Sequence, residues 1–341
     1  MQKFYPDSMN IELTTFCPLS CPQCYCSLSA GKHIRLDTAK YWIREGTSFG
    51  VQDVMLSGGE TLCYPYLFDI IETIRECKGI PYVALSGYGF NEEVLDKLLS
   101  SGVEGIFISL NGSTKEINSV SRDGYDYAIN ALKLLRAINH NKTWINWVMH
   151  SNNSNDFFNV IELAEHYMVS YLAVMSAKPD SSNTLLTLPS NTQMQNVGKI
   201  IGSYRGKVKI FVESCYSPMR ALLKETKLFG NFNTNKDKGC AAGRNTFSVS
   251  VDGLLSPCRH LAFHENYSTI RSYWHESSIL HRIREAESQK REPCASCHFS
   301  NYCRHCIAIN AKLNNDLFIG YENCALYRPV KSYLLSDKDG G

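Results

Sequence analysis

Short apolar runs alternate with amphipathic stretches along the first half of the chain, with the periods that mark strands and helices. The apolar runs predict strands at residues 10–14, 53–56, 82–85, 105–110, 143–149 and 171–175. Apolar residues spaced three and four apart predict helices at 38–49, 66–77, 91–100, 125–139 and 156–167. This alternation is typical of a parallel sheet covered by helices, either doubly wound or closed into a full or partial barrel.

The pattern changes after about Pro179, where loops become more frequent. Residues 207–212 predict one more strand, and residues 279–289 predict a helix. Asp252-Gly253 stands between two apolar runs, which is a strong signal for a β-hairpin. The polar tail at 331–341 is expected to be disordered.

Cysteine is the residue type whose number stands out, because the chain has 14 cysteines among 341 residues. Four lie within residues 17–26 and seven within 240–324, while Cys63, Cys77 and Cys215 stand alone. A reducing compartment does not support a disulfide framework, so many of these thiols should be ligands for zinc or iron-sulfur clusters. The sequence therefore predicts two metal-binding regions separated by a cysteine-poor stretch.

Charge and hydropathy exclude several other classes of protein. The 35 Lys and Arg residues nearly balance the 33 Asp and Glu residues, and no basic run is long enough for a nucleic-acid footprint. No apolar stretch approaches the length of about 18 residues that a membrane helix needs, and the first residues do not resemble a signal peptide. We expect a cytoplasmic protein that binds neither nucleic acid nor a membrane.

The first cysteine group follows the first expected strand directly, in the segment CPLSCPQC at residues 17–24. Pro18 and Pro22 disfavour a helix, so we expect a loop at the rim where βα barrels place their chemistry. Three thiolates can hold three irons of a four-iron cluster and leave the fourth iron open. A zinc site, or a ferredoxin-like cluster with Cys26 as the fourth ligand, is the alternative.

The second expected strand ends at the same rim in Ser57-Gly58-Gly59-Glu60. Glycines lack a Cβ atom and let the backbone approach a ligand closely. The Glu60 carboxylate can accept a charge-assisted hydrogen bond from an ammonium group.

These two motifs in this order closely resemble those of the radical S-adenosylmethionine (SAM) enzymes, over roughly residues 8–180. The resemblance implies a partial (β/α)6 barrel and a [4Fe-4S] cluster held by Cys17, Cys21 and Cys24. It also implies that SAM binds the open iron and that the Gly58-Gly59-Glu60 segment contacts the SAM amino group. SAM is then cleaved reductively to a 5′-deoxyadenosyl radical, which abstracts a hydrogen from the substrate.

The same resemblance implies further contacts to SAM. Tyr25 would lie beside the adenine, and Ser109 would reach SAM from the fourth strand. Ser109 belongs to the segment ISLNG, in which Asn111 replaces the aspartate that is commoner in the family. Arg122 would lie near the SAM carboxylate, and Asn146 on the fifth strand points to the same region. A loop hydroxyl and an ion-paired arginine are the alternatives for Ser109 and Arg122.

The C-terminal cysteines follow a spacing similar to the SPASM extension of radical SAM enzymes, over about residues 235–330. That extension binds two auxiliary [4Fe-4S] clusters through seven cysteines. The resemblance implies an outer cluster on Cys294, Cys297, Cys303 and Cys324, and an inner cluster on Cys240, Cys258 and Cys306. Zinc ribbons are the alternative for such cysteine pairs.

Two details of this region leave the inner cluster open to interpretation. Only Arg304 and His305 separate Cys303 from Cys306, where the family usually has three residues. With three thiolates, the inner cluster would keep an open iron or recruit a further ligand. Cys215 is a candidate for that ligand; the alternative is that Cys215 is a buried structural cysteine. His260 and His305 adjoin implied ligands. The resemblances divide the chain into a barrel at 1–180, a connecting region at 181–234, a SPASM domain at 235–330 and the tail.

SPASM enzymes act mainly on peptides, so the first hypothesis is oxidative maturation of a ribosomally synthesised peptide by a thioether or carbon-carbon cross-link, or by epimerisation. The implied partners are a peptide with a leader, a separate leader-recognition protein and a flavodoxin or ferredoxin type reductant. No catalytic residue is assigned; Ser86, Tyr88 and Met149 are candidates by position only.

Three other hypotheses remain. The first is a small-molecule dehydrogenase, decarboxylase or epimerase of the same architecture. The second is an anaerobic sulfatase-type formylglycine maturase, which is disfavoured because Arg259 stands where those enzymes have a catalytic aspartate. The third is an iron-sulfur electron-transfer protein without enzymatic activity.

Overall fold

The computed structural model describes residues 4–24, 26, 31–178, 188–225, 239–261, 263–285, 290–300, 303–314, 316–318, 320 and 324. The strands within these residues are β1 (Ser8–Thr14), β2 (Asp53–Gly58), β3 (Ile80–Leu85), β4 (Gly105–Ser109), β5 (Thr143–Met149), β6 (Tyr171–Ser176), β7 (Lys209–Val212), β8 (Thr246–Val249) and β9 (Leu255–Ser256). The α-helices are α1 (Leu36–Phe49), α2 (Leu67–Glu76), α3 (Glu92–Ser100), α4 (Lys115–Ser119), α5 (Tyr125–Ala137), α6 (Phe157–His166), α7 (Asn191–Ser203), α8 (Ser217–Glu225), α9 (Ile270–Glu276), α10 (Ser278–Glu285) and α11 (Ile307–Asn314). Short 3-10 helices lie at η1 (Thr61–Cys63) and η2 (Ser154–Asp156).

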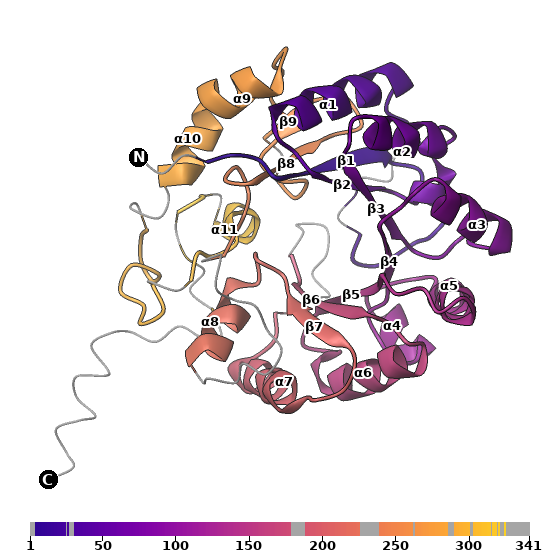
Figure 1. The fold of residues 1–341 in the computed structure, drawn as a ribbon. Helices are drawn as coiled ribbons and strands as arrows, with labels where there is room; N and C mark the ends of the chain where they lie inside the picture. Colours follow the sequence, from indigo (N-terminus) through magenta and orange to yellow (C-terminus); the bar gives the residue numbers. More distant parts are fainter. Residues whose placement is uncertain are drawn as a thin grey trace, which may run out of the picture.

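The described strands form one sheet in the order β7-β6-β5-β4-β3-β2-β1-β8-β9. Neighbouring strands are parallel except β8 and β9, which form an antiparallel hairpin. The strands curve around the centre of the molecule, with α1, α2, α3, α5 and α6 on their outer side (Figure 1). The predicted fold of successive parallel strands with helices outside is confirmed, as is the hairpin at Asp252-Gly253.

Each strand divides its side chains between the helices and the interior. On β5, Ile145 and Trp147 are fully buried against the helices, while Trp144 and Asn146 face the interior. Near the amino ends of the strands the interior is aromatic, since the Trp144 ring stacks on Tyr171 with centroids 4.1 Å apart and on Phe107 at 4.8 Å. Polar side chains follow nearer the carboxyl ends, so one end of the interior is filled and the other can accept a polar ligand.

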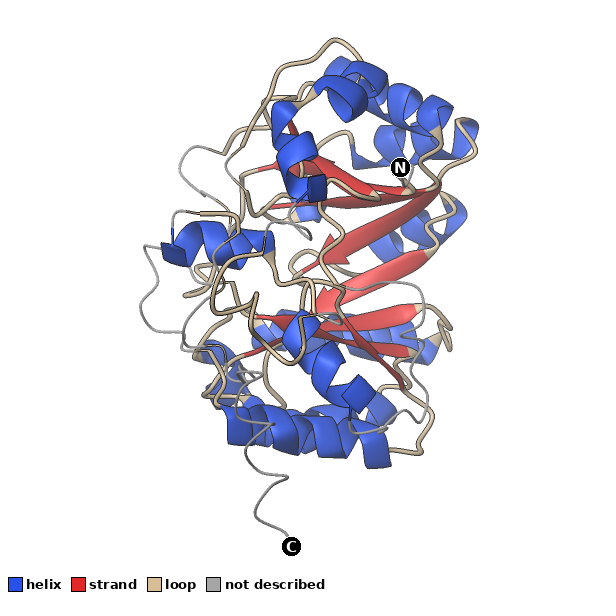
Figure 2. Ribbon diagram, turned by 90° about the vertical axis from the view of Figure 1, so that its left-hand side faces the viewer, coloured by secondary structure: helices blue, strands red, loops and turns tan. Residues whose placement is uncertain are grey.

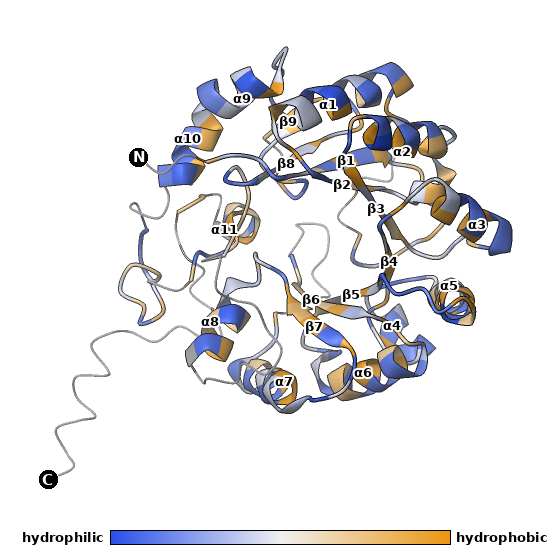
Figure 3. Cartoon of the chain, in the orientation of Figure 1, coloured by the Kyte–Doolittle hydropathy of each residue, from blue (hydrophilic) through white to orange (hydrophobic). Residues whose placement is uncertain are grey.

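The helices turn polar faces outward, and the loops lie at one end of the strands. Helices such as α3 and α10 are hydrophilic on their outer faces, whereas β6 is strongly hydrophobic (Figure 3). The loops gather on the side toward which the strand arrows point (Figure 2). None of the helices in the described part of the chain is long and apolar enough to cross a bilayer.

The second half of the chain contains helices that the sequence pattern did not predict, namely α7, α8, α9 and α11. A signal was present for α7, because Ser190 and Gln193 form a reciprocal capping box at its start. The helix expected at 279–289 is α10, which ends at Glu285 before residues that lie outside the described ranges. The tail at 331–341 also lies outside them.

The C-terminal part joins the same sheet as the N-terminal strands. β8 pairs in parallel with β1, from Ser8 opposite Thr246 to Ile11 opposite Val249. β7 likewise extends the sheet beyond β6. The division of the chain at residues 180 and 235 stays a prediction, but the sheet itself runs through both parts.

A buried histidine at the end of β5 gives a pH-dependent stability. His150 is fully buried, and burial lowers its pKa from 6.5 to about 4. As the pH falls, the imidazole of His150 is protonated in the unfolded chain before it is protonated in the folded protein. The folded state therefore has its full stability above pH 6.5 and loses stability toward pH 4. We expect the protein to lose about 2 kcal/mol of unfolding free energy from this group between pH 7 and pH 5.

Thermal melting of the iron-loaded protein at both pH values would measure this loss. The His150→Asn variant should show a weaker pH dependence, since an amide oxygen can accept the Asn152 N–H in place of Nδ1. Replacing the exposed His166 by glutamine is the control. An equal pH dependence in the wild type and His150→Asn would contradict this assignment.

Candidate functional site

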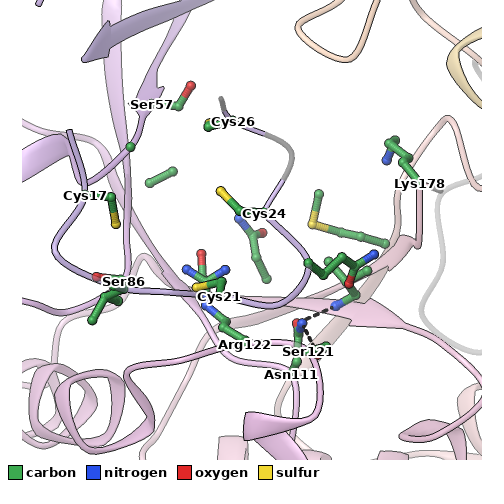
Figure 4. A pocket seen from close by; sticks show the side chains of 18 of the residues that line it. Cys17, Cys21, Cys24, Cys26, Ser57, Ser86, Asn111, Ser121, Arg122 and Lys178 are labelled. Atoms are coloured by element: carbon green, nitrogen blue, oxygen red, sulfur yellow. Dashed lines mark hydrogen bonds between the residues drawn. The ribbon is translucent and has the colours of Figure 1, made fainter. Parts of the chain in front are cut away.

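A cavity opens at the carboxyl ends of the parallel strands and encloses about 1160 Å³, including space open to solvent. Figure 4 shows Cys17, Cys21 and Cys24 on one side of this space and Lys178 on the other. The residues predicted from the sequence that line the cavity are Cys17, Cys21, Cys24, Gly58, Gly59, Ser109, Arg122 and Asn146. The structure therefore brings together residues that are up to 129 positions apart in the chain.

The first cysteine group lies on a loop, as predicted. Residues 17–24 contain no helix, and the turn at Cys21 is held by the Cys24 N–H, which donates to the Cys21 carbonyl at 3.2 Å. Burial is the main cause that raises the pKa of Cys17 to about 11, and the neighbouring Glu60, Cys21 and Cys24 raise it further. A thiolate at Cys17 would therefore be stabilised by a cationic metal centre that takes the place of its proton.

Cys26 lines the same cavity but has a different environment. Its thiol donates to the Gly58 carbonyl at 3.0 Å. Tyr25, the predicted adenine contact, lies outside the described residues.

The glycine pair is required by the cysteine loop itself. The Gly59 N–H donates to the Thr14 carbonyl at 2.6 Å, and the Glu60 N–H donates to the Phe16 carbonyl at 2.8 Å. A Cβ atom at Gly58 would stand 2.3 Å from the Thr14 oxygen, and one at Gly59 would stand 2.1 Å from the Phe16 oxygen. The sequence indicates glycines here for the approach of a ligand, and the structure adds that the loop before Cys17 passes directly over them.

This packing predicts the effect of a methyl group at Gly59. In Gly59→Ala the loop that carries Cys17 must move, and such overpacking costs about 1–3 kcal/mol. We expect lower iron content and loss of SAM cleavage in addition to a lower melting temperature. Gly89→Ala is the control, because Gly89 has a positive φ but a Cβ atom added there would have no neighbour within 4 Å. If both variants lose iron equally, collision with the loop is not the cause.

Glu60 lies beneath the cavity wall and is 1% exposed. One carboxylate oxygen accepts hydrogen bonds from the N–H of Ser86, at 2.9 Å, and from its hydroxyl, while the other accepts the Leu62 N–H at 3.2 Å. Burial raises the pKa of Glu60, and the Ser86 and Leu62 bonds and Arg122 oppose that rise. Glu60 thus joins the ends of β2 and β3, and Ser86, which the sequence named only by position, is its main partner.

The other predicted SAM contacts lie on neighbouring strands. Ser109 on β4 is directly opposite Asn146 on β5, so both side chains face the cavity. Arg122 also lines the cavity, and its buried Nε–H has no hydrogen-bond partner among the described residues. A buried guanidinium N–H that lacks an acceptor fits an anionic group such as the SAM carboxylate.

Asn111 has a structural role beside the cavity. Its Nδ2 donates to the Ser121 hydroxyl at 2.8 Å, and its Oδ1 accepts the Val148 N–H at 3.0 Å. Asn111 therefore holds the segment that carries Arg122 against β5.

Sequence reasoning missed a buried cation on the far wall. The Lys178 ammonium donates to the Glu213 carboxylate at 3.1 Å and to the Ser176 carbonyl at 3.3 Å. Burial alone would lower the pKa of Lys178, but Cys215, Glu213 and Cys306 raise it, so the side chain stays charged. Arg259 and His260 line the same wall. The position of Lys178, just after β6, is the signal that could have found it, because barrel rims carry functional side chains.

The C-terminal cysteines form two groups. The outer group (Cys294, Cys297, Cys303 and Cys324) lines a second cavity of about 460 Å³. The inner group (Cys215, Cys240, Cys258 and Cys306) packs in one small apolar cluster, in which Cys240 and Cys306 are buried. Hydrogen bonds from Cys306 and from the Ile307 and Ala242 N–H groups lower the pKa of Cys240, which favours its thiolate. Among the described residues, no three or more His, Cys, Asp or Glu side chains are arranged to hold a single metal ion.

Comparison with known protein families gives a match over the part of the chain that contains the first cysteine group. Residues 11–164 match the family model of the radical SAM superfamily. This part of the chain is a radical SAM domain. The match includes the cysteine loop, the Gly58-Gly59-Glu60 turn, Ser109, Arg122 and Asn146. A radical SAM domain implies a [4Fe-4S] cluster and SAM, and the three cavity thiols and the partnerless Arg122 N–H fit them.

Two characterised relatives extend beyond the radical SAM domain. The AdoMet-dependent heme synthase of Methanosarcina barkeri is 25% identical over 94% of this chain and 96% of that protein. The PqqA peptide cyclase of Ruegeria pomeroyi is 26% identical over 89% of this chain and 80% of that protein.

A solved structure shows the same fold. Streptococcus suis SuiB bound to S-adenosylmethionine superposes with a TM-score of 0.75 at 17% identity, over 94% of this chain and 78% of SuiB. SuiB has also been solved bound to its precursor peptide SuiA, with a TM-score of 0.74. The cysteine-rich C-terminal region lies within the shared fold.

Proposed function

We propose that this protein is a radical SAM enzyme that oxidatively modifies a ribosomally synthesised peptide. One relative acts on a peptide, the PqqA peptide cyclase, and SuiB binds a precursor peptide. The proposed reaction is a thioether or carbon-carbon cross-link, or epimerisation. The proposed partners are a peptide with a leader, a separate leader-recognition protein and a flavodoxin or ferredoxin type reductant in the cytoplasm.

The proposed cofactors are a SAM-binding [4Fe-4S] cluster, SAM and two auxiliary [4Fe-4S] clusters. When bound, the first cluster and SAM supply a 5′-deoxyadenosyl radical. Cys17, Cys21 and Cys24 would hold that cluster, and Gly58, Gly59, Glu60, Ser109, Arg122, Asn146 and Tyr25 would bind SAM. The implied ligands of the auxiliary clusters are Cys240, Cys258 and Cys306 for the inner one and Cys294, Cys297, Cys303 and Cys324 for the outer one.

The observation that carries this proposal is the composition of the cavity wall. Cys17, Cys21 and Cys24 share one cavity with Arg259 and His260, which directly follow the inner-group residue Cys258. A substrate in this cavity would meet the radical site and the surroundings of an auxiliary site together. An enzyme that abstracts one hydrogen and then removes a second electron needs this proximity.

A second candidate function is the oxidation of a carboxylated small molecule. The heme synthase relative matches 96% of its own length. Lys178 and Arg259 place cationic side chains on the cavity wall, and these would suit carboxylates. The sulfatase-type alternative has less support, since a cation, Arg259, lies where its catalytic base would be required.

The test is an anaerobic assay of the iron-loaded protein with SAM, a reductant and the short peptide encoded nearest its gene. Peptide mass and 5′-deoxyadenosine are measured together. We expect 5′-deoxyadenosine together with a peptide that has lost two hydrogens. If the reaction inverts a centre instead, the same assay in deuterated water should give a peptide that carries one deuterium. 5′-Deoxyadenosine with an unchanged peptide would favour the small-molecule candidate, and its absence would contradict both.

A further inference from the structure

The inner group contains one thiol more than the seven-cysteine pattern supplies. Cys240 and Cys306 are buried in a small apolar cluster, and Cys215 and Cys258 pack against that cluster. Cys215 lies 25 positions before the first cysteine of the C-terminal pattern and outside its spacing. The cluster therefore gathers thiols from four separate segments of the chain.

A single backbone carbonyl draws three of these segments together. The Arg304 carbonyl accepts the Cys240 N–H at 3.2 Å and also the hydroxyl of Ser217, at the start of α8. A Cβ atom at Gly239 would stand 2.3 Å from the same carbonyl oxygen, so the backbone must come this close. Cys215, Cys240 and Cys306 each lie within two residues of one of these contacts, which explains why their thiols meet.

The thiols themselves are in contact. The Cys306 thiol is hydrogen-bonded to both Cys215 and Cys240. Cys258 is close enough for Cys240 and Cys215 to disfavour its ionisation. The Cys215 thiol also contacts the Glu213 carboxylate, which is neutralised by the buried Lys178 ammonium. The Lys178–Glu213 ion pair therefore lies beside Cys215.

We propose that Cys215 is the fourth thiolate ligand of the inner auxiliary cluster. This inference rests on the proposed function, which assigns a cluster to the inner group. Four cysteines are the usual complement of a [4Fe-4S] cluster. With Cys215 bound, no iron of the inner cluster is left for a substrate thiolate. Cys324 also packs near the inner group, but it lines the outer cavity with three other cysteines.

The test uses the full chain, reconstituted anaerobically with iron and sulfide, as wild type, Cys215→Ala and Cys215→Ser. Cys77→Ala is the matched control, because Cys77 is partly buried against the main core at the end of α2. Iron and sulfide content and the EPR spectrum of the reduced protein are measured before and after a small alkyl thiol is added.

We expect Cys215→Ala either to lose one cluster or to keep it with an EPR signal that changes when the thiol is added. The wild type and Cys77→Ala should keep all clusters and show no such change. Wild-type iron content and an unresponsive spectrum in Cys215→Ala would overturn the proposal.

A second measurement does not depend on any variant. Iodoacetamide labelling of the wild type, read by mass spectrometry, should modify Cys215 after the iron is removed by a chelator but not before. Equal labelling in both states would overturn the proposal. The peptide assay is scored separately, so an inactive enzyme with a protected Cys215 would contradict the proposed function and leave this ligand assignment standing.

Discussion

Cys21→Ala is expected to reduce 5′-deoxyadenosine formation by more than about 100-fold. Loss of a residue that only hydrogen-bonds to a metal ligand usually costs about 10- to 100-fold in metal affinity or activity, so loss of a proposed ligand itself should cost more. Cys21 is one of four thiols on the cavity wall after β1, and one of the three that are proposed as cluster ligands. The fourth of these thiols, Cys26, is hydrogen-bonded to the Gly58 carbonyl. A cluster that loses Cys21 could recruit Cys26 in its place only if this hydrogen bond breaks.

Cys26→Ala is the matched control for this prediction. Cys26 lines the same cavity two residues after Cys24, so its replacement perturbs the same loop without removing a proposed ligand. We expect this variant to keep its iron and to cleave SAM. If Cys26→Ala instead loses the cluster as completely as Cys21→Ala, the ferredoxin-like arrangement with four cysteines would be the better description.

Glu60→Gln is expected to weaken SAM binding about 10- to 100-fold, the effect of losing one hydrogen bond to a charged group. It should also lower the unfolding free energy by about 1–3 kcal/mol. The stability effect arises because the new amide NH2 would face a backbone N–H in either orientation, that of Ser86 or that of Leu62, where the carboxylate oxygens now accept hydrogen bonds. Equilibrium dialysis against labelled SAM and thermal melting measure the two effects separately.

The division between these two effects tests what Glu60 does. If the melting temperature falls while the affinity for SAM is unchanged, Glu60 only joins β2 to β3, and its assignment as a SAM contact is wrong. Glu76→Gln at the exposed end of α2 is the control for removal of a carboxylate. We expect neither measurement to change in that variant.

The repeating βα part of the fold could be predicted because its signal is local. Each strand from β1 to β5 is a short run with apolar residues followed by an amphipathic helix, and successive parallel strands lie side by side. The pairing of β8 with β1 has no such signal, because its partners are far apart in the sequence. The helices α8 and α11 were missed because each is short and lies among loops and cysteines, so few residues show the helical spacing of apolar positions.

The site was predictable where one residue type has few alternative uses. Closely spaced cysteines after a strand identify a metal-binding loop, and the structure places them on the cavity. The residue type of Lys178 gave no signal, because a lysine is nearly always exposed and only its contact with Glu213, 35 positions later, explains its burial; its position after β6 was the one indication. Cys215 was one of three isolated cysteines, and only the fold distinguishes it from Cys77.

The pairing of β8 with β1 also has a consequence for the order in which the protein can mature in the cell. β1 is among the first segments to leave the ribosome, but the strand that covers its outer edge follows about 240 residues later. At ordinary rates of synthesis this delay is about 10 to 50 s, during which the edge of β1 is exposed to pairing with other chains. Protection of that edge is thus a task for the newly made chain until β8 pairs with β1 and covers it.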